Sequence, residues 1–557
     1  MTTPQALTSD QPWTHLNDDA DCCLLLETDI LPPYANTCRW FAGKARQQEA
    51  FRIRQMHQIP MEATIAYLFI MEVRYADGDT ESYQLPVSFV DIAAPNAPDI
   101  PAKGIITVAY FQGQRGLLVD GIYDERFRLA LFHHLTAQST LRQEAGQVTF
   151  QRGRGLAGED INAPASGRVL PVDSSNSALV YNEKYFLKLY RKLFSETNPE
   201  VDMVSFLTEN SDFAHIPAYA GGVVWQRPDA PDVTLGMMQR MVENEKDSWA
   251  QTGDYLNDFL YAVPNRLFAI KEDVFDKVEL LARRTAEMHL ALYKPGHADE
   301  PTDPAFAPEQ FTDDYRVFII GRLEHLLERR YSLLVDNYQK LDPLAQRLAW
   351  VFMEAKEMID EFVADFRTRP LESLRVRIHG DYHLGQVLAT APDRSNDFII
   401  IDFEGEPESS ITERKIKHSP LKDVAGMIRS YHYAVCAKLF NSAETEGIDS
   451  EHLQRVSDRW FRLIRDTYVD TYLETFGSPH PLFKDNTEIN FLLLVYLLEK
   501  AVYELGYEIS YRPAWVKIPL KGIVDVIREI EKIRMADTSR SADVPRLQTG
   551  LLQTKKA

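Results

Sequence analysis

Two kinds of hydrophobic pattern divide the chain, and the first predicts β structure. Between about Ala63 and Phe89, runs rich in Ile, Val, Tyr and Phe flank the turn signal Ala76-Asp77-Gly78-Asp79, which predicts a β-hairpin. Further β-type runs follow at Gly104–Tyr110 and Leu117–Tyr123. We therefore expect the N-terminal region to be a largely β unit.

A second β-type segment follows a polar, glycine-rich stretch from Ala137 to Gly167, which we interpret as a connection with room for short strands. Strands are predicted at Ala178–Tyr181 and Tyr185–Tyr190, joined by the turn Asn182-Glu183-Lys184. The next segment, NPEVDMVSFLTEN, is typical of a helix start.

Beyond about Val242 the second pattern dominates, and it is helical. Apolar residues recur at helical spacing in VFDKVELLARRTAEMHLAL, YRVFIIGRLEHLLERRYSLL and LAQRLAWVFMEAKEMIDEFVADF, and again between Asn490 and Arg534. The last residues contain few large apolar side chains, so we expect a mobile tail. The patterns predict an α+β fold with a mainly β cap at 1–135, a small β-rich lobe at 136–242, a large helical lobe at 243–535 and a tail at 536–557.

Composition narrows the function classes. The 557 residues include 61 Lys+Arg and 82 Asp+Glu, a formal net charge of −21. A strongly negative field repels polyanions, which argues against non-specific nucleic-acid binding and against binding to anionic membranes. The opening MTTPQALTSDQPW has no basic start and no apolar core, and the sequence has no apolar run of about 18 residues. We therefore expect a cytoplasmic protein without a membrane span.

The four cysteines are Cys22, Cys23, Cys38 and Cys436. No neighbouring cluster of histidine or cysteine completes a zinc site. We interpret them as reduced thiols that are mostly buried.

The residues with the clearest chemistry lie in the segment IHGDYHLGQVLATAPDRSNDFIIIDFEGEP, residues 378–407. Strands are expected at Val387–Thr390 and Phe398–Ile401, joined by a turn that contains Pro392, Asp393, Ser395 and Asn396. The outer ends of the two strands of an antiparallel hairpin lie side by side. These ends carry His379, Asp381, His383 and Gln386 on one side and Asp402 and Glu404 on the other.

Carboxylates and an amide gathered in this way suit phosphoryl transfer, in which positioning and charge neutralisation do most of the work. Asp381 fits the group that accepts or orients the proton of the attacking hydroxyl, and Gln386 and Asp402 fit oxygen ligands of Mg²⁺. In isolation each element has a structural interpretation. HGD is typical of a turn, DFEGEP of an acidic loop, and His383 of a packed histidine.

Together, HGDYHLGQVL and IDFEGEP resemble the maltokinase branch of the aminoglycoside-phosphotransferase and kinase-like superfamily. The resemblance implies a bilobal kinase-like fold with Asp381 as the catalytic residue and Gln386 and Asp402 on Mg²⁺. The loop amide is more usually asparagine in the superfamily, so Gln386 departs from the broad pattern and agrees with the maltokinase form HLGQ.

Other segments extend the resemblance in the same order along the chain. RWFAGKAR is similar to the start of the maltokinase cap, SNSALVYNEKYFLKLYR to the nucleotide-binding strands, TLGMMQRMVENEKDSW to the hinge, and RRTAEMHLAL to a further part of the family. The resemblance implies that Lys188 binds phosphate and that Gln239 and Met241 meet the adenine; Lys184 is the alternative lysine.

The acidic partner of Lys188 is left open between Glu200 and Asp202, because the family usually has Glu at the place of Asp202. No GxGxxG or GxxxxGK[ST] motif precedes Lys188. The phosphates would then be covered by the Ser174–Ser177 turn, including Ser175 and Asn176.

A sugar acceptor is expected at EKAVYELGYEISYRPAW, which also has the look of the family. In a helix that reaches about Ser510, one broad face would hold Lys500, Tyr503, Glu504 and Tyr507, followed by Arg512 and Trp515. His383 and Glu404 complete the expected acceptor set. The alternative is that the two tyrosines are core residues.

The resemblance implies ATP-dependent phosphorylation of maltose at its anomeric hydroxyl, which gives maltose 1-phosphate for α-glucan and glycogen synthesis. The residues alone support only a hydroxyl acceptor. In some relatives the kinase is fused to or complexed with trehalose synthase, so that enzyme is a candidate partner on a separate chain. The alternatives are a kinase of glucosamine or an aminoglycoside, and a non-catalytic kinase-like scaffold.

Overall fold

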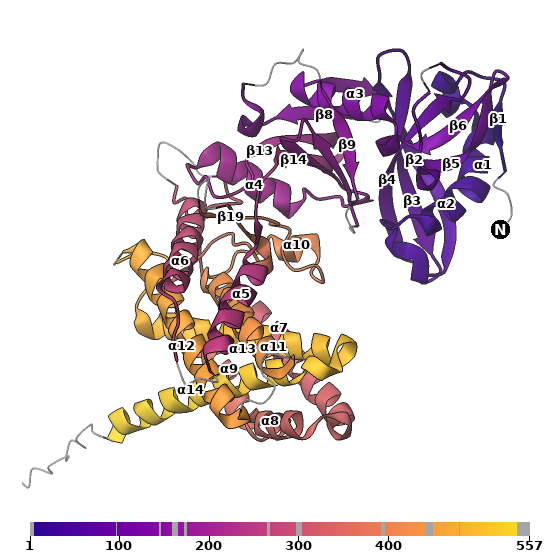
Figure 1. Ribbon diagram of the computed structural model, residues 1–557. Helices are drawn as coiled ribbons and strands as arrows, with labels where there is room; N and C mark the ends of the chain where they lie inside the picture. The colour runs from indigo at the N-terminus through magenta and orange to yellow at the C-terminus, as the bar shows by residue number, and fades with distance from the viewer. Residues whose placement is uncertain are drawn as a thin grey trace, which may run out of the picture. The chain divides into compact units, whose positions relative to one another are not determined.

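The structure, a computed structural model, describes residues 5–542 except 96, 144–145, 159–164, 172–174, 264–267, 297–302, 392–395, 442–448 and 478. The chain forms two compact units. Unit 1 comprises Met1–Asn244 and Ile399–Lys415, and unit 2 comprises Glu245–Phe398 and Ile416–Ala557. Figure 1 shows strands concentrated in the N-terminal half and helices in the C-terminal half. The expected α+β class is therefore confirmed, whereas the four domain limits stay predictions.

The first sheet of unit 1 contains the predicted hairpin, which is confirmed as β3 (Ile65–Tyr75) and β4 (Thr80–Asp91). Among the described residues the sheet has seven strands, in the order β1-β5-β6-β4-β3-β2, with β12 paired to β4. The other strands are β1 (Leu7–Ser9), β2 (Gln48–Pro60), β5 (Ile105–Phe111), β6 (Gln114–Asp120) and β12 (Lys192–Leu193). The short helices α1 (Ala20–Leu25) and α2 (Leu31–Thr37) precede β2.

The second sheet of unit 1 has the order β7-β8-β13-β14-β11-β10-β9. The predicted strands are confirmed as β10 (Ser177–Tyr181) and β11 (Tyr185–Leu189), which pair antiparallel. Two strands lie within the glycine-rich connection, β7 and β8. The remaining bounds are β7 (Thr140–Gln143), β8 (Gly146–Arg152), β9 (Gly167–Leu170), β13 (Tyr219–Arg227) and β14 (Ala230–Arg240), with helices α3 (Glu125–Thr136) and α4 (Pro199–Asn210).

Strand β3 is buried on both faces, so the two sheets share hydrophobic packing. Tyr67 and Phe69 join a core with the N-terminal helices, whereas Leu68 and Ile70 join a core that also contains Leu187 of β11. A run that is buried on both faces loses the strict alternation of polar and apolar residues. The core that contains Leu68 and Ile70 therefore includes residues on both sides of residue 135.

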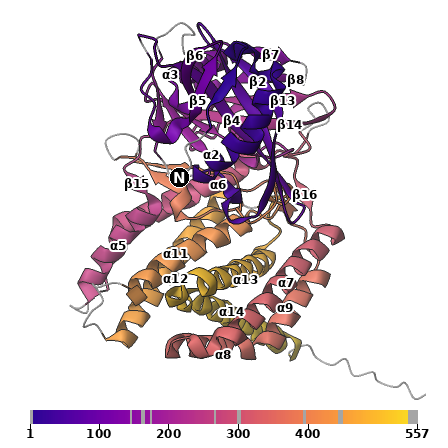
Figure 2. The ribbon, with the colours of Figure 1, turned by 90° about the vertical axis from the view of Figure 1, so that its right-hand side faces the viewer.

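Unit 2 is mainly helical, as expected, and Figure 2 shows its long helices. Their bounds are α5 (Ser248–Ala262), α6 (Glu272–Leu292), α7 (Asp313–Asn337), α8 (Pro343–Glu354), α9 (Lys356–Thr368), α11 (Leu421–Asn441), α12 (Ser450–Phe476), α13 (Asn486–Tyr511) and α14 (Lys517–Ala542). Helix α14 runs past residue 535 into the predicted tail, because no Gly or Pro interrupts residues 536–542; residues 543–557 lie outside the described part.

Short strands interrupt the helices of unit 2. They are β15 (Lys246–Asp247), β16 (Glu309–Gln310), β17 (Leu374–Arg375) and β18 (Val387–Ala389), and the chain passes into unit 1 within β19 (Phe398–Ile400). Strands β18 and β19 are neighbours in one small sheet, which confirms the predicted hairpin; Pro392, Asp393 and Ser395 of its turn lie outside the described residues. Residues Ile399–Lys415, which include the short helix α10 (Ile411–Arg414), belong to unit 1.

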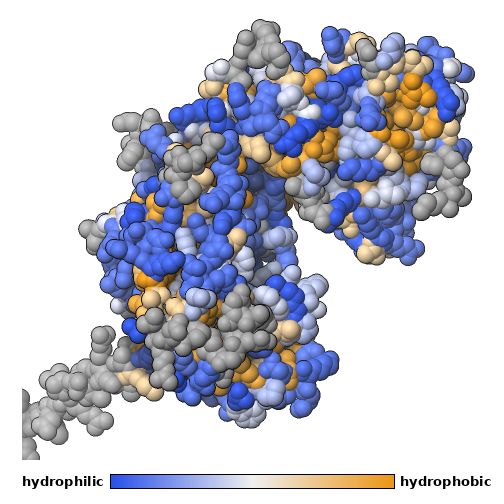
Figure 3. Space-filling model, viewed as in Figure 1, coloured by the Kyte–Doolittle hydropathy of each residue, from blue (hydrophilic) through white to orange (hydrophobic). Residues whose placement is uncertain are grey.

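The surface seen in Figure 3 is largely hydrophilic, with scattered apolar areas. Within the part of the chain that the structure describes, none of the helices has the length and apolar character needed to cross a bilayer. The four cysteines are free thiols, and burial raises the pKa of Cys436 to about 12.

Candidate active site

Lys188 lies on β11 with its side chain on the opposite face from the apolar neighbours. Leu187 and Leu189 are buried in the shared core of unit 1, as alternation along a strand requires. The Lys188 Nζ lies 2.8 Å from Oε2 of Glu200 on α4, and the hydroxyl of Tyr190 donates to the same oxygen at 3.0 Å. Kinases bind phosphate with a lysine on a strand that pairs with a glutamate on a helix, and a phosphate-binding role for Lys188 stays a prediction.

Glu200, and not Asp202, is the residue that pairs with Lys188. Asp202 instead forms an ion pair with Lys415, at 3.0 Å. Asn198 caps α4 by accepting from the backbone N–H of Glu200 at 2.8 Å, which places Glu200 in the first turn of the helix. The two acidic residues stand only two positions apart, so they point in different directions around the helix. Of the two candidates left open by the sequence, Glu200 is therefore the partner of Lys188, and a contact of Asp202 with the nucleotide stays a prediction.

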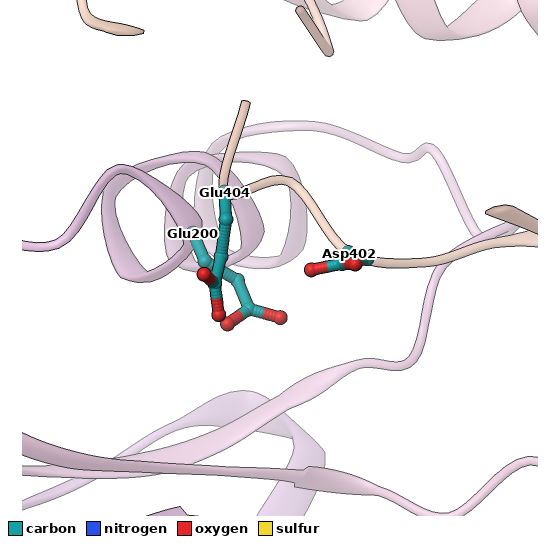
Figure 4. A group of neighbouring side chains, drawn as sticks. All are labelled: Glu200, Asp402 and Glu404. Atoms are coloured by element: carbon teal, nitrogen blue, oxygen red, sulfur yellow. The ribbon is translucent and has the colours of Figure 1, made fainter. Parts of the chain in front are cut away.

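Asp402 and Glu404 lie beside the same lysine. Figure 4 shows Glu200 on its helix facing Glu404, with Asp402 directed toward the same space from the loop that carries Glu404. Lys188 Nζ is 3.9 Å from Oδ1 of Asp402 and bonds to Glu404. Asp402 has φ of 66°, a left-handed conformation that few non-glycine residues adopt and that is often found at functional sites.

Charge in this cluster is unbalanced, because three carboxylates surround one ammonium group. Burial raises the pKa of Glu200 to about 7; Lys188 acts to lower it, and Glu404 and Asp402 act to raise it further. Burial would lower the pKa of Lys188, but the carboxylates hold it above its usual range. One oxygen from each of Glu200, Asp402 and Glu404 lies within 4.8 Å of the others, and oxygen donors at this spacing fit a hard divalent cation such as Mg²⁺.

The other expected nucleotide residues are also in unit 1. Ser175 and Asn176 directly precede β10, and Gln239 belongs to β14 opposite Phe186 of β11. Met241 follows β14, and its backbone N–H donates to the carbonyl of Lys184 at 2.7 Å. Nucleotide contacts by these residues stay predictions.

In unit 2, the HGD loop is held by a buried aspartate that sequence reasoning missed. Asp423 of α11 accepts from the backbone N–H groups of His379 and Gly380 at 2.8 and 2.9 Å. His289 Nε2 lies 3.0 Å from Asp423, and its Nδ1 lies 2.8 Å from the hydroxyl of Tyr472. Burial would raise the pKa of Asp423, but the hydrogen bond and charge of His289 lower it. A fixed carboxylate therefore sets the backbone that presents Asp381.

Asp381 is a partly buried carboxylate with two basic neighbours. Its Oδ1 lies 3.1 Å from Lys500 Nζ, and its Oδ2 lies 4.0 Å from His383 Nε2. Burial would raise the pKa of Asp381, but Lys500 and then His383 lower it. His383 Nδ1 accepts from the backbone N–H of Gly385 at 3.1 Å, which leaves Nε2 as the protonated nitrogen that faces Asp381. Asp381 is thus kept ionised, as a group that orients or accepts a hydroxyl proton must be.

Gln386 ends a short 3₁₀ turn, Leu384–Gln386, directly before β18. Its backbone N–H donates to the carbonyl of His383 at 2.9 Å, and its side chain is partly buried. A magnesium-binding role for Gln386 stays a prediction.

The expected acceptor residues lie on α13 and just after it, and several already have partners. Arg429 Nε donates to Glu504 at 3.1 Å, and Arg512 donates to Glu508 at 2.6 Å. Glu508 also accepts from the hydroxyl of Tyr433. The Trp515 ring stacks on Tyr433 at 6.3 Å with an interplanar angle of 18°.

Of the tyrosines on α13, Tyr503 is partly buried under Lys500, whose Nζ lies 5.5 Å from the ring centroid, and Tyr507 is 42% exposed. Neither tyrosine is a core residue, so the alternative that they are core residues is wrong. Their contact with a sugar stays a prediction.

The predicted residues therefore form two groups. Unit 1 brings together Lys188, Asp402 and Glu404, with Glu200 added; unit 2 brings together Asp381, His383 and Lys500. Glu404, expected at the acceptor, contacts Lys188, and its role toward a sugar stays a prediction. Asp423, Arg429 and Tyr433 were missed, because each is remote in sequence from the motif it supports. Glu508 lies within the expected acceptor segment but was not singled out.

Comparison with known proteins gives the family context. Residues 34–124 match the model of the maltokinase N-terminal cap domain. The chain is 22% identical over 373 residues to a glucosamine kinase of Streptacidiphilus jiangxiensis, which covers 66% of this chain and 75% of that protein.

Among solved structures, a glucosamine kinase in complex with glucosamine, ADP and inorganic phosphate superposes with a TM-score of 0.61 at 16% identity. That match covers 89% of this chain and 98% of the other. A crystal form of glucosamine kinase gives 0.60 at 17% identity, covering 86% of this chain and 92% of the other. The chain therefore has the kinase-like fold that these proteins share.

Proposed function

We propose that this protein is a sugar kinase that transfers the terminal phosphoryl group of ATP to a hydroxyl group, with maltose as its acceptor. The reaction converts ATP and maltose into ADP and maltose 1-phosphate, which feeds α-glucan and glycogen synthesis. The observation that carries the proposal is the Lys188–Glu200 ion pair on a strand and a helix with Asp402 beside it. Kinase-fold enzymes use this combination to bind phosphates and their metal ion.

In this proposal Lys188 binds the phosphates that are not transferred. Asp381, kept ionised by Lys500, orients the acceptor hydroxyl and takes its proton as the bond to phosphorus forms. Gln386 and Asp402 would hold Mg²⁺, which supplies charge neutralisation at the phosphates. The carboxylate oxygens around Lys188 support this role, because they are the donors that Mg²⁺ prefers.

Maltose is favoured over other acceptors by two features. Residues 34–124 match a cap domain named for maltokinases, and the carboxylates near Asp381 have cationic partners of their own. A neutral sugar suits such a surface, whereas a cationic acceptor would bind better to carboxylates that have no cationic partner in the protein.

Glucosamine is the second candidate acceptor. A glucosamine kinase structure with bound glucosamine matches 89% of this chain, far more than the cap model does. The ammonium group of Lys500 beside Asp381 argues against it, because an amino sugar would bring a second positive charge to the same carboxylate.

The test is to incubate the full chain with ATP, Mg²⁺ and one acceptor at a time: maltose, glucosamine, glucose or an aminoglycoside. Mass spectrometry identifies the phosphorylated product, and NMR locates the phosphate. Phosphate on the anomeric oxygen of maltose is the expected result. Phosphorylated glucosamine alone would favour the second candidate, and binding of ADP without transfer to any acceptor would favour a kinase-like scaffold.

A trehalose synthase on a separate chain and a cytoplasmic location remain part of the proposal. Gel filtration of this protein with co-expressed trehalose synthase tests the first: separate elution of the two proteins would contradict it.

A further inference from the structure

The two sheets of unit 1 are joined directly after Lys188. Strand β11 ends at Leu189, and the chain continues into β12, which pairs antiparallel with β4 of the first sheet. In that pairing, Lys192 is opposite Tyr83 and Leu193 is opposite Ser82. Strand β4 lies within residues 34–124, the part that matches the cap domain. The strand that carries the phosphate-binding lysine is therefore extended by two residues that belong to the cap sheet.

Gln84 of β4 donates hydrogen bonds to residues at this junction. Its backbone N–H donates to the carbonyl of Arg191 at 2.8 Å, and its side-chain Nε2 donates to the carbonyls of Tyr190 and Leu235, both at 2.5 Å. Leu235 lies on β14, the neighbour of β11, and Gln84 is completely buried. One cap side chain thus donates to the carbonyl of Tyr190, directly after β11, and to the carbonyl of Leu235 on β14, which also accepts from the backbone N–H of Tyr190 at 3.0 Å. Loss of a donor to a buried carbonyl is unfavourable.

Arg191 makes a second connection through a buried ion pair. Its NH2 donates to Oδ2 of Asp120 at 2.6 Å, and its Nε donates to the hydroxyl of Ser177 at 2.8 Å. The side chains of Arg191 and Asp120 are 0% and 2% exposed. Asp120 ends β6 of the cap sheet and Ser177 begins β10, so Arg191 bridges the two sheets. The guanidinium also lies 5.1 Å from the ring of Trp40.

Tyr190 carries this connection to the site. Gln84 holds its carbonyl, and its hydroxyl donates to Glu200, the carboxylate that pairs with Lys188. A continuous series of hydrogen bonds and ion pairs therefore runs from the cap to Lys188 through Gln84, Tyr190 and Glu200. All of these residues except Lys188 are more than nine-tenths buried, so the series has little room to rearrange.

We propose that the cap sheet positions the Lys188–Glu200 pair, and that Gln84 and the Asp120–Arg191 pair are the positioning residues that set the affinity for the nucleoside triphosphate. The inference rests on the proposed function for the phosphate-binding role of Lys188. It assigns the cap a part in nucleotide binding.

The test measures binding of ATP to the full chain by isothermal titration, together with KM for ATP and for the acceptor. Gln84→Met keeps the length and apolar stem of the side chain but removes both donors. We expect it to raise Kd and KM for ATP about tenfold and to leave KM for the acceptor within about twofold. Tyr190→Phe removes only the hydroxyl that bonds Glu200, and it should raise Kd for ATP about threefold.

Two matched controls separate positioning from general stability. Ser88 lies four residues further along β4, is completely buried, and its hydroxyl has no hydrogen-bond partner in the described structure. Ser88→Ala should therefore bind ATP as the wild type does. Val73→Ala removes buried apolar volume from the core on the helical side of the cap and removes none of the hydrogen bonds described above. It should lower the melting temperature without changing Kd for ATP.

The inference is overturned if Gln84→Met and Tyr190→Phe bind ATP like the wild type, or if Val73→Ala weakens ATP binding as much as they do. Should Gln84→Met not fold, Asp120→Asn decides the matter, because it keeps the shape of a cap side chain and removes the charge that pairs with Arg191. Lys188→Met in the same titration tests the underlying assignment. Unchanged ATP affinity in that variant would contradict the proposed function itself, whereas weaker binding there with normal binding in the junction variants would contradict only the role of the cap.

Discussion

The two groups of candidate residues differ in the balance between carboxylates and cations. In unit 1, the single ammonium group of Lys188 faces three carboxylates, and the pKa of Glu200 is raised to about 7. In unit 2, three acidic residues of the HGD loop and α13 each have a cation of their own: Asp381 has Lys500, Glu504 has Arg429 and Glu508 has Arg512. The cluster of unit 1 thus has excess negative charge, whereas these three carboxylates of unit 2 are each paired with a cation.

The difference indicates which ligand each group suits. Like charges gathered in a partly buried space raise one another's free energy, and a divalent cation that joins them relieves the repulsion. The cluster of unit 1 therefore suits a metal–nucleotide complex. A balanced set of ion pairs has little net attraction for charge, but its donors and acceptors can still bond the hydroxyl groups of a neutral sugar. The contrast matches the proposed division between nucleotide and acceptor.

The largest effect is expected for Asp381→Asn, which removes the charge of the Asp381 carboxylate and keeps the shape of the side chain. We expect kcat to fall by about 10³-fold or more, because an amide cannot take the hydroxyl proton. Binding of ADP, measured by titration, should stay within about twofold of the wild type. Turnover close to that of the wild type would contradict the assignment.

A matched carboxylate serves as the control for that experiment. Asp397, at the start of the second strand of the hairpin, pairs with Arg284 at 2.7 Å and belongs to neither group. Asp397→Asn should retain kcat within about threefold of the wild type once the variant is shown to be folded.

Lys188→Met tests the cluster of unit 1, because it removes the ammonium group that pairs with Glu200 and Glu404. We expect kcat/KM for ATP to fall about 100-fold, since the three carboxylates then repel the phosphates and the Lys188 ammonium group no longer binds them. KM for the acceptor should change little. Lys184→Met tests the alternative lysine, and a larger loss in that variant would transfer the phosphate-binding role to Lys184.

Several features of the site could be predicted because they follow from local rules. Alternation along a strand places Lys188 opposite to Leu187 and Leu189, and the turn residues Asn182 and Glu183, with φ of 53° and 51°, close the hairpin that positions β11. The hairpin between Val387 and Ile400 was found in the same way.

Other features depend on tertiary packing and leave no local signal. The hydrophobic pattern of α4 does not reveal whether Glu200 or Asp202 faces Lys188. Asp423 supports the HGD loop from a different helix, 43 and 44 residues away. Strand β2 was missed because it lies at the edge of its sheet and carries polar side chains on much of its length.

The smallest effect is expected for Lys500→Met. This variant removes the cation that pairs with Asp381 but keeps the carboxylate. The pKa of Asp381 is held below its usual range by Lys500 and His383, against a burial effect in the opposite direction. Without Lys500 the burial effect gains weight, so the pKa of Asp381 rises. The ionised form is the active one, and the acid limb of the profile of kcat/KM against pH should therefore move to higher pH.

The expected signature is a loss that depends on pH. The fall in kcat/KM should be largest on the acid side of the profile and should shrink to about fivefold or less near pH 8. The same reasoning applies to stability: a lowered carboxyl pKa stabilises the fold above the unfolded value of 3.8, and that contribution is lost as pH falls through the folded pKa. Lys500→Met should therefore also reduce the melting temperature more at pH 7 than at pH 3. Lys500→Arg keeps the positive charge and should leave the acid limb near its wild-type position. An equal loss at every pH in Lys500→Met would mean that Lys500 only binds the acceptor, and its ion pair with Asp381 would then have no part in ionising that carboxylate.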